Sequence, residues 1–178
     1  MSTDDEEIAE IAIRYGASVP FMRPKELADD YAGTIPVVRH AIHEVLPTPT
    51  DEDLICCIYA TAPFLSSLDI RQGLVLLREL KSNFAMAIAK FPAPIQRSFY
   101  VEDNQHLRMF DEKHFHTRSQ ELIPAFHDAG QFYWGRALAW LSTTNLFQDA
   151  CAGVKIPLSR VQDIDDQEDW DRAEILAQ

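Results

Sequence analysis

Two uninterrupted runs of apolar residues most constrain what this chain can fold into. They are LICCIYA at residues 54–60 and FAMAIA at residues 84–89. A strand that is buried on both faces of a parallel sheet carries such a run instead of an alternating pattern. Between the two runs, apolar residues recur at helical spacing over about residues 68–80. A helix between two buried strands predicts an α/β fold, because parallel strands need a crossover connection.

The N-terminal part of the chain predicts two further helices. Thr3 and Glu6 have the spacing of a capping box, which predicts a helix that begins at Thr3 and stops at Gly16. The short apolar run SVPFM predicts a strand, and Thr34 is placed to cap the second helix. Both helices carry apolar faces that a sheet or core must cover.

The C-terminal half changes character and then returns to the buried pattern. Residues 92–126 are rich in charge, His and Pro, and they predict an insertion that carries a hairpin. After it, GQFYW predicts another buried strand, followed by a helix near residues 136–141 and a last helix from about Asp166. We therefore expect one domain over residues 1–178 with this insertion.

Charge and cysteine content exclude several classes of protein. The chain has 16 basic and 28 acidic residues and a net charge of −12, which argues against nucleic-acid binding. No apolar run approaches the length needed to span a bilayer, so no membrane is expected. Of three cysteines, Cys56 and Cys57 are neighbours on opposite faces of a strand. This pattern does not suit a disulfide framework and favours a reduced, cytoplasmic protein.

The segment VQDIDDQEDW is the best candidate for chemistry. Asp163 and Asp165 alternate across one residue, so both carboxylates point to the same side of an extended segment. Two such carboxylates suit Mg²⁺, which takes its remaining oxygens from phosphate and water. The alternative is that Asp165 or Asp166 only caps the last helix.

Two other stretches are candidates for ligand binding. In RPKELADD, Arg23 offers a planar fork of donors to a phosphate or ribose, and the alternative is an arginine of a solvated loop. TRSQEL and FHDAGQFYWGR place polar side chains beside a buried strand, where a site or simply the polar ends of core elements would lie.

These stretches together resemble the CMP-sialic acid synthetases, in the same order along essentially the whole chain. RPKELADD resembles the family's RPxELAxD motif, and VQDIDDQEDW resembles its DIDxxxD metal segment. HFHTRSQEL with FHDAGQFYWGR is closer still to the branch that acts on pseudaminic acid. The resemblance implies a Rossmann-like nucleotide-diphospho-sugar transferase fold, a three-layer α/β/α arrangement with a mainly parallel sheet and a small dimerisation insertion.

The resemblance also implies an activity and a set of site residues. The family transfers CMP from CTP to a nonulosonic acid and releases pyrophosphate, with Mg²⁺ or Mn²⁺ as cofactor. Asp163 and Asp165 match the catalytic metal ligands, while Arg23 and Thr34 match positions that contact the nucleotide. Contacts to the sugar are implied for Tyr59, Gln96, Arg97, Arg118 and Gln131.

Two of these positions bear on the partners. Arg118 matches a sugar contact that relatives supply across a dimer, which implies a homodimer built partly from the insertion. Tyr59 replaces a glutamine that sialate synthetases use near the sugar, which favours pseudaminic acid. The alternatives are a synthetase for N-acetylneuraminate, legionaminate or Kdo, and an inactive remnant that only dimerises or binds sugar.

The family's phosphate loop has no counterpart in this sequence. Relatives begin with a strand and a loop of the ARGGSKxIPxKN type that cradles the CTP phosphates. Here Met1 falls where the second strand of the family ends. We therefore expect that N-terminal strands and the loop are missing ahead of Met1, either because the true start lies upstream or because the gene is truncated. The chain as it stands is expected to be poorly soluble or partly molten, with no measurable CTP-dependent activity.

Overall fold

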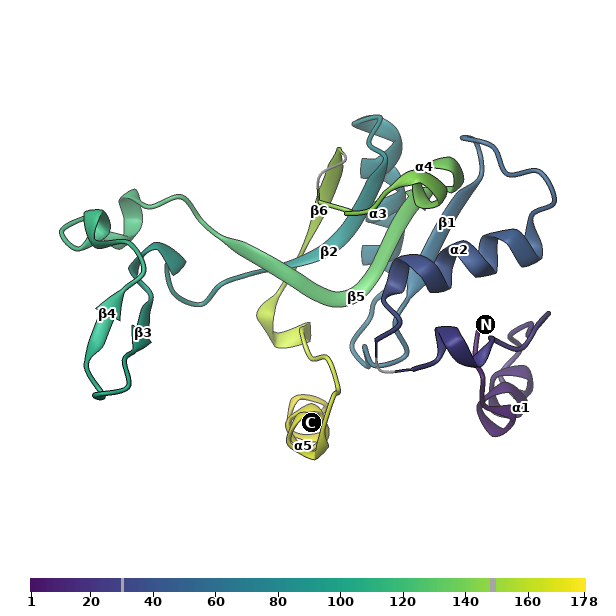
Figure 1. Cartoon of the computed structure of the whole chain (residues 1–178), viewed down its shortest axis with the longest axis horizontal. Helices are drawn as coiled ribbons and strands as arrows, with labels where there is room; N and C mark the ends of the chain where they lie inside the picture. Colours follow the sequence, from purple (N-terminus) through teal and green to yellow (C-terminus); the bar gives the residue numbers. More distant parts are fainter. Residues whose placement is uncertain (30, 148–149) are drawn as a thin grey trace. The chain divides into compact units, whose positions relative to one another are not determined.

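The computed structural model describes residues 1–29, 31–147 and 150–178 (Figure 1). The strands are β1 (Leu54–Ile58), β2 (Phe84–Lys90), β3 (Phe99–Val101), β4 (Leu107–Met109), β5 (Phe126–Arg136) and β6 (Cys151–Ile156). The helices are α1 (Glu6–Arg14), α2 (Thr34–Val45), α3 (Ser67–Glu79), α4 (Ala137–Ser142) and α5 (Gln167–Leu176). Short 3₁₀ turns lie between them at Lys25–Leu27, Ile95–Arg97, Glu112–His114, Ser119–Glu121 and Leu158–Arg160.

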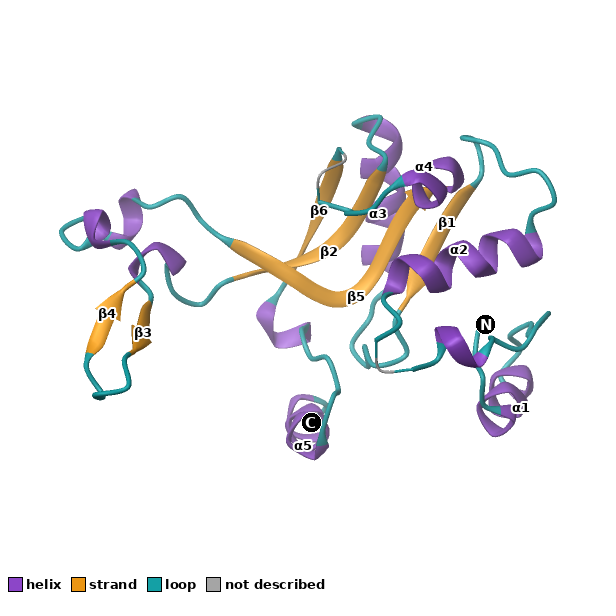
Figure 2. Ribbon diagram, in the orientation of Figure 1, coloured by secondary structure: helices purple, strands orange, loops and turns teal. Residues whose placement is uncertain are grey.

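Four strands form the main sheet in the order β1-β5-β2-β6 (Figure 2). The backbone N–H of Tyr59 donates to the Gln131 carbonyl, and that of Ala137 donates to the Asp53 carbonyl. Residue numbers therefore rise along β1 while they fall along the paired β5, so the two strands run antiparallel. Bonds from Arg136 to Asn83 and from Phe91 to Ala125 show the same relation between β5 and β2. β5 is therefore an interior strand that runs antiparallel to both of its neighbours, which makes the sheet mixed.

The chain divides into two compact units, and each is formed by three segments. The first unit comprises Met1–Cys57, Leu76–Ala85 and Tyr133–Ala152. The second unit comprises Ile58–Val75, Met86–Phe132 and Gly153–Gln178. Each unit contains part of every strand of the main sheet.

An aromatic pair forms the centre of the first unit. The rings of Phe84 and Trp140 meet edge to face with centroids 5.2 Å apart, and both side chains are almost completely buried. Gly135 makes this contact possible, because a Cβ there would overlap Trp140 Nε1. α2 packs against α4, and Arg39 on α2 donates from Nε to the Trp140 carbonyl at 2.9 Å. The end of α4 is thereby tied to the core.

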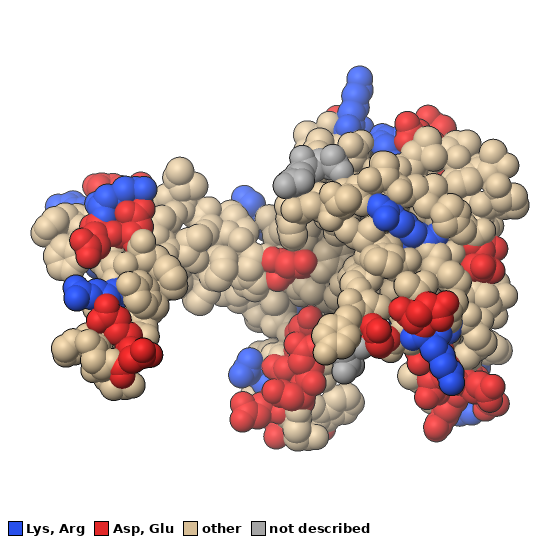
Figure 3. All heavy atoms as spheres, in the orientation of Figure 1, with Lys and Arg blue, Asp and Glu red and all other residues tan. Residues whose placement is uncertain are grey.

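The second unit contains the insertion and the last helix. β3 and β4 pair as an antiparallel hairpin in which Tyr100 faces Arg108. Close packing elsewhere in the unit depends on a glycine of β6, because a Cβ at Gly153 would overlap the side chain of Ile88. Acidic side chains gather over α5 (Figure 3), which contains Glu168, Asp169, Asp171 and Glu174.

Most expected elements are present, and the expected hairpin in the insertion is confirmed. Two expectations near the N-terminus are wrong. Asp5 and not Thr3 caps α1, because the Asp5 carboxylate accepts the N–H of Ile8 at 2.9 Å. Residues 18–22, all described, form no strand. Gly16 does end the first helix, with φ of +90°.

The burial expected of LICCIYA is also only partly correct. β1 is an edge strand whose residues are half-buried or exposed, whereas β2 is almost fully buried as expected. An unbroken apolar run therefore marks a strand here without showing that both of its faces are covered. Within the described residues, no helix combines the length and apolar character that crossing a membrane requires.

Candidate functional site

Asp163 lies against a glycine that leaves room for its carboxylate. Gly130 on β5 has φ of +61°, and a Cβ there would lie 2.7 Å from Asp163 Oδ2. The other oxygen, Oδ1, is buried and has no hydrogen-bond partner. A buried carboxylate oxygen without a donor is costly unless something else satisfies it. An oxygen in this position is suited to bind a cation.

The backbone around Asp163 is held from two sides. The N–H of Ile164 donates to the carbonyl of Thr61 at 3.3 Å, in the loop that follows β1. The N–H of Asp165 donates to Asp169 Oδ2 at 3.1 Å. Asp166 caps α5 by accepting the N–H of Asp169 at 3.0 Å. The capping alternative thus applies to Asp166, and it leaves the carboxylates of Asp163 and Asp165 for other contacts.

Asp169 organises the turn between Asp163 and the start of α5. Its pKa is lowered below the ordinary value of 3.8, mainly because it accepts the N–H of Asp165 and also the Gln162 amide. Gln162 is almost completely buried, and its Nε2 reaches Asp169 Oδ1 and the carbonyl of Asp163 at 2.9 Å each. An ionised Asp169 therefore keeps this turn in place at neutral pH.

Gln131 lies fully buried one residue from Gly130. Its Nε2 donates to the carbonyl of Arg160 at 2.6 Å, while its Oε1 is buried without a partner. Tyr59 is half-buried just beyond β1, and its N–H donates to the Gln131 carbonyl at 3.0 Å. The structure thus brings Tyr59, Gln131 and Asp163 into one part of the second unit.

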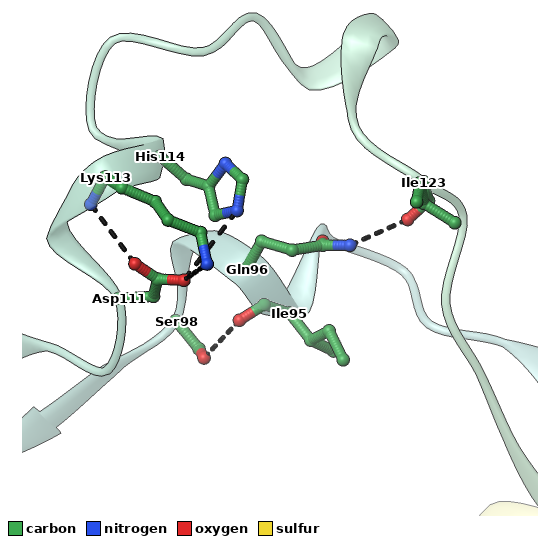
Figure 4. Close-up of polar contacts among 7 residues, drawn as sticks. All are labelled: Ile95, Gln96, Ser98, Asp111, Lys113, His114 and Ile123. Atoms are coloured by element: carbon green, nitrogen blue, oxygen red, sulfur yellow. Dashed lines mark hydrogen bonds and ion pairs between the residues drawn. The ribbon is translucent and has the colours of Figure 1, made fainter.

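The other sugar-binding candidates lie in the insertion, and Figure 4 shows one of them, Gln96. Gln96 donates from Nε2 to the carbonyl of Ile123 at 2.8 Å, which ties the two ends of the insertion together. Arg97 and Arg118 are exposed. Elsewhere in the insertion, the Asp111 carboxylate accepts from Lys113 at 2.6 Å, and this contact lowers the pKa of Asp111.

The nucleotide candidates belong to the first unit. Arg23 donates from Nη2 to Asp4 Oδ1 at 3.0 Å, and its backbone N–H donates to the carbonyl of Thr3 at 2.8 Å. Its Nε is buried and has no partner. Thr34 is the first residue of α2 and is half-buried, so Gly33 takes the capping position expected of Thr34. Asp30, the last residue of the RPKELADD motif, lies outside the described residues.

The carboxylates of Asp163 and Asp165 fit a hard divalent cation that takes its remaining ligands from substrate and water. In the described part of the chain, no group of three or more His, Cys, Asp or Glu side chains is arranged to hold a metal. Asp163 and Asp165 would therefore supply two carboxylates at most. Mg²⁺ characteristically binds through one or two carboxylates and takes further oxygens from substrate phosphate and water.

Sequence reasoning missed the residues that support Asp163. Gly130, Thr61 and Asp169 are far from Asp163 in sequence or look like ordinary loop and helix residues. The one available signal was the glycine, because a glycine inside a strand pattern often marks a close approach of another group.

Known proteins resemble the chain along nearly its whole length. A family model described as cytidylyltransferase matches residues 1–152. The chain is 43% identical over 176 residues to a pseudaminic acid cytidylyltransferase of Campylobacter jejuni, covering 99% of this chain and 76% of that protein. It is 26% identical over 179 residues to an N-acylneuraminate cytidylyltransferase of Escherichia coli, covering 100% and 41%.

A solved structure agrees with the fold. CMP:2-keto-3-deoxy-manno-octonic acid synthetase, complexed with CTP, superposes with a TM-score of 0.65 and covers 99% of this chain and 78% of its own. At 13% identity this likeness shows the fold alone, and it confirms the expected Rossmann-like arrangement. The family model and the Campylobacter relative confirm the resemblance drawn from the motifs: the chain belongs to the cytidylyltransferase family.

Proposed function

We propose that this chain is a cytidylyltransferase that transfers CMP from CTP to pseudaminic acid. The observation that carries the proposal is the 43% identity to the Campylobacter pseudaminic acid cytidylyltransferase over 99% of the chain. In the reaction, a hydroxyl oxygen of the sugar forms a bond to the α-phosphorus of CTP. The bond to pyrophosphate breaks, pyrophosphate leaves, and the hydroxyl proton is lost.

Asp163 and Asp165 hold a divalent cation, Mg²⁺ or Mn²⁺, in this proposal. The buried, unpartnered Oδ1 of Asp163 supports this role, because a cation would satisfy it. A bound cation would neutralise charge on the phosphate oxygens. The chain's own contribution is to hold both carboxylates in place before substrate arrives and to bind the nucleotide through Arg23 and Thr34.

The sugar is bound by residues of the second unit. Tyr59 and the exposed guanidinium groups of Arg97 and Arg118 are proposed to contact it, and a sugar carboxylate suits the fork of an arginine. The amides of Gln96 and Gln131 already donate to backbone carbonyls, so we propose that they support the site from behind its surface. Each keeps a buried oxygen that could accept from a sugar donor or a water.

A homodimer and a cytoplasmic location complete the proposal. The insertion exposes apolar side chains on its hairpin, at Phe99, Val101 and Leu107, and just after it, at Phe110 and Phe115. Exposed apolar surface of this kind favours pairing with a second copy. The three cysteines are free thiols, which suits a reducing compartment.

The test is turnover with defined sugars. The purified chain is supplied with CTP and Mg²⁺ together with pseudaminic acid or N-acetylneuraminate, and pyrophosphate release and CMP-sugar mass are measured. A second chain, extended at its N-terminus by an ARGGSK-type strand and phosphate loop, is assayed in parallel. We expect CMP-pseudaminic acid to form in preference to CMP-N-acetylneuraminate.

Asp163→Asn, introduced into the extended chain, tests the metal role in the same assay. It keeps the size of the side chain and removes the charge that holds a cation, so product should disappear while circular dichroism stays unchanged. Product formation at the wild-type rate would remove the metal role of Asp163. Turnover of N-acetylneuraminate alone would replace the proposed sugar.

A further inference from the structure

Arg160, three residues before Asp163, forms an ion pair with Asp69 that none of the sequence motifs indicated. The guanidinium of Arg160 donates through Nη1 to Asp69 Oδ2 and through Nη2 to Asp69 Oδ1, the latter at 3.3 Å. Asp69 is in the first turn of α3 and is only 8% exposed, and the Arg160 side chain is 34% exposed. Two-point pairing of this kind fixes both the distance and the plane of the arginine.

The backbone of Arg160 is held as well as its side chain. Its carbonyl accepts the Nε2 of Gln131 at 2.6 Å, and Gln131 has no exposed surface. Gln131 adjoins Gly130, the residue that leaves space for the Asp163 carboxylate. Arg160 is therefore fixed at both ends, to α3 by its guanidinium and to β5 by its carbonyl.

We infer that Arg160 and Asp69 form a positioning pair that fixes the segment carrying Asp163. Neither residue is one of the proposed cation ligands. Arg160 anchors one end of the segment, the bond from Ile164 to Thr61 anchors the middle, and Asp169 anchors the Asp165 end. With all three in place, the Asp163 carboxylate is oriented before any ligand binds. This inference rests on the proposed metal role of Asp163.

The ion pair also makes the Asp69 carboxylate unavailable as a ligand for the cation. Asp69 is ion-paired with Arg160, and hydrogen bonding to Asp69 raises the pKa of the Arg160 guanidinium. Removing the arginine would leave a buried carboxylate without a partner, which is strongly unfavourable. The neighbouring backbone would have to rearrange in order to bring water to Asp69.

The test compares local order with metal affinity in the 178-residue chain. Hydrogen exchange of the Ile164 and Asp165 amides is followed by NMR, and Mn²⁺ binding is followed by electron paramagnetic resonance. Arg160→Gln and Asp69→Asn each break the pair, and Arg160→Lys keeps the charge without the fork. Arg108→Gln is the matched control, because Arg108 pairs with Glu102 at 3.1 Å on the hairpin.

Arg160→Gln and Asp69→Asn should each raise exchange at Ile164 and Asp165 at least about tenfold and weaken Mn²⁺ binding about tenfold, as loss of supporting contacts does at metal sites. Arg160→Lys should recover part of both losses, and amides of β2 should exchange as in the wild type. Exchange at Ile164 that rises no more than in Arg108→Gln, or that rises together with the β2 amides, overturns the positioning role. If the wild-type chain binds no Mn²⁺, the proposed metal function fails, while the exchange data still decide whether the pair orders the segment.

Discussion

Gly130 and Asp163 occupy one space: the carboxylate of Asp163 lies where the side chain of any other residue at position 130 would begin. A Cβ at Gly130 would be 2.7 Å from Oδ2 and 3.1 Å from Cγ of Asp163. The contact joins the middle of β5 to the segment before α5, in the second unit. It gives the proposed metal site a steric requirement that does not depend on any ligand.

Gly130→Ala should therefore displace the Asp163 carboxylate. We expect Mn²⁺ affinity, measured by electron paramagnetic resonance, to fall at least about tenfold, as for other disturbed supporting residues of metal sites. Gly16→Ala is the control, because Gly16 also has positive φ, of +90°, but a Cβ there would meet no atom within 4 Å. It should cost about 1 kcal/mol of stability and leave Mn²⁺ binding unchanged. Equal affinities in the two variants would contradict the steric argument.

Gly135→Ala should weaken the core of the first unit. The new Cβ would overlap Trp140 Nε1 and lie 2.6 Å from Phe84 Cε1, so the aromatic pair must separate. Overpacking of this kind costs about 1–3 kcal/mol in the free energy of unfolding. Urea denaturation and near-ultraviolet circular dichroism measure the effect. Gly33→Ala, where a Cβ meets nothing within 4 Å, should not alter the aromatic signal.

The pairing of Arg23 with Asp4 predicts a pH effect at the N-terminus. The hydrogen bond from Arg23 holds the pKa of Asp4 below its ordinary value of 3.8. A carboxyl whose folded pKa is depressed contributes stability above its unfolded pKa and loses it as the pH falls through the folded pKa. Arg23→Gln should raise the pKa of Asp4 in an NMR titration, whereas Arg14→Gln should not. An unchanged Asp4 titration in Arg23→Gln would contradict the pairing.

The thiols of β1 should be unreactive at neutral pH. Burial raises the pKa of Cys56 to about 12 and that of Cys57 to about 11, from an ordinary value of 9.0. The thiolate is the nucleophile, so both should react with a disulfide reagent far more slowly in the folded chain than in urea. A thiol whose pKa is raised by folding stabilises the fold below its unfolded pKa. We therefore expect stability to fall as the pH rises from about 9 towards 12.

Leu107→Asp should weaken the proposed dimer. Leu107 is 64% exposed on β4 and faces Val101 of β3, which is 59% exposed. A carboxylate on this apolar face would have to lose water when two copies pair. Light scattering on a size-exclusion column should show a smaller mass than for the wild type. Leu80→Asp, at a leucine that is 63% exposed outside the insertion, should leave the mass unchanged.

Local patterns predicted most of the elements, with the strand expected at residues 18–22 as an exception, but they did not predict how strands pair. β1 and β2 correspond to the apolar runs at residues 54–60 and 84–89, and α3 corresponds to the helix predicted between them. Each of these elements is specified by the pattern of its own residues. The antiparallel course of β5 between β1 and β2 was not predicted, since pairing across tens of residues leaves no mark on the local pattern.

The same difference between local patterns and distant partners applies to the candidate site. The sequence predicted Asp163 and Asp165 through a motif of neighbouring residues. It did not reveal that Arg160 pairs with Asp69, because 91 positions separate the two and each alone resembles an ordinary surface charge. It also placed the first helix cap at Thr3 and not at Asp5; in the structure Thr3 Oγ1 accepts the N–H of Asp5, and Asp5 caps the helix.

The middle position of β5 has a consequence for how the chain is made. Both of its neighbours, β1 and β2, leave the ribosome before it does, and neither can complete its hydrogen bonding until residues 126–136 emerge. At roughly 5–20 residues per second, this leaves the nascent chain with unpaired strand edges for a time on the order of seconds. During that interval the apolar β2 is exposed to chaperones. The length of the insertion between β2 and β5 sets the duration of this exposure.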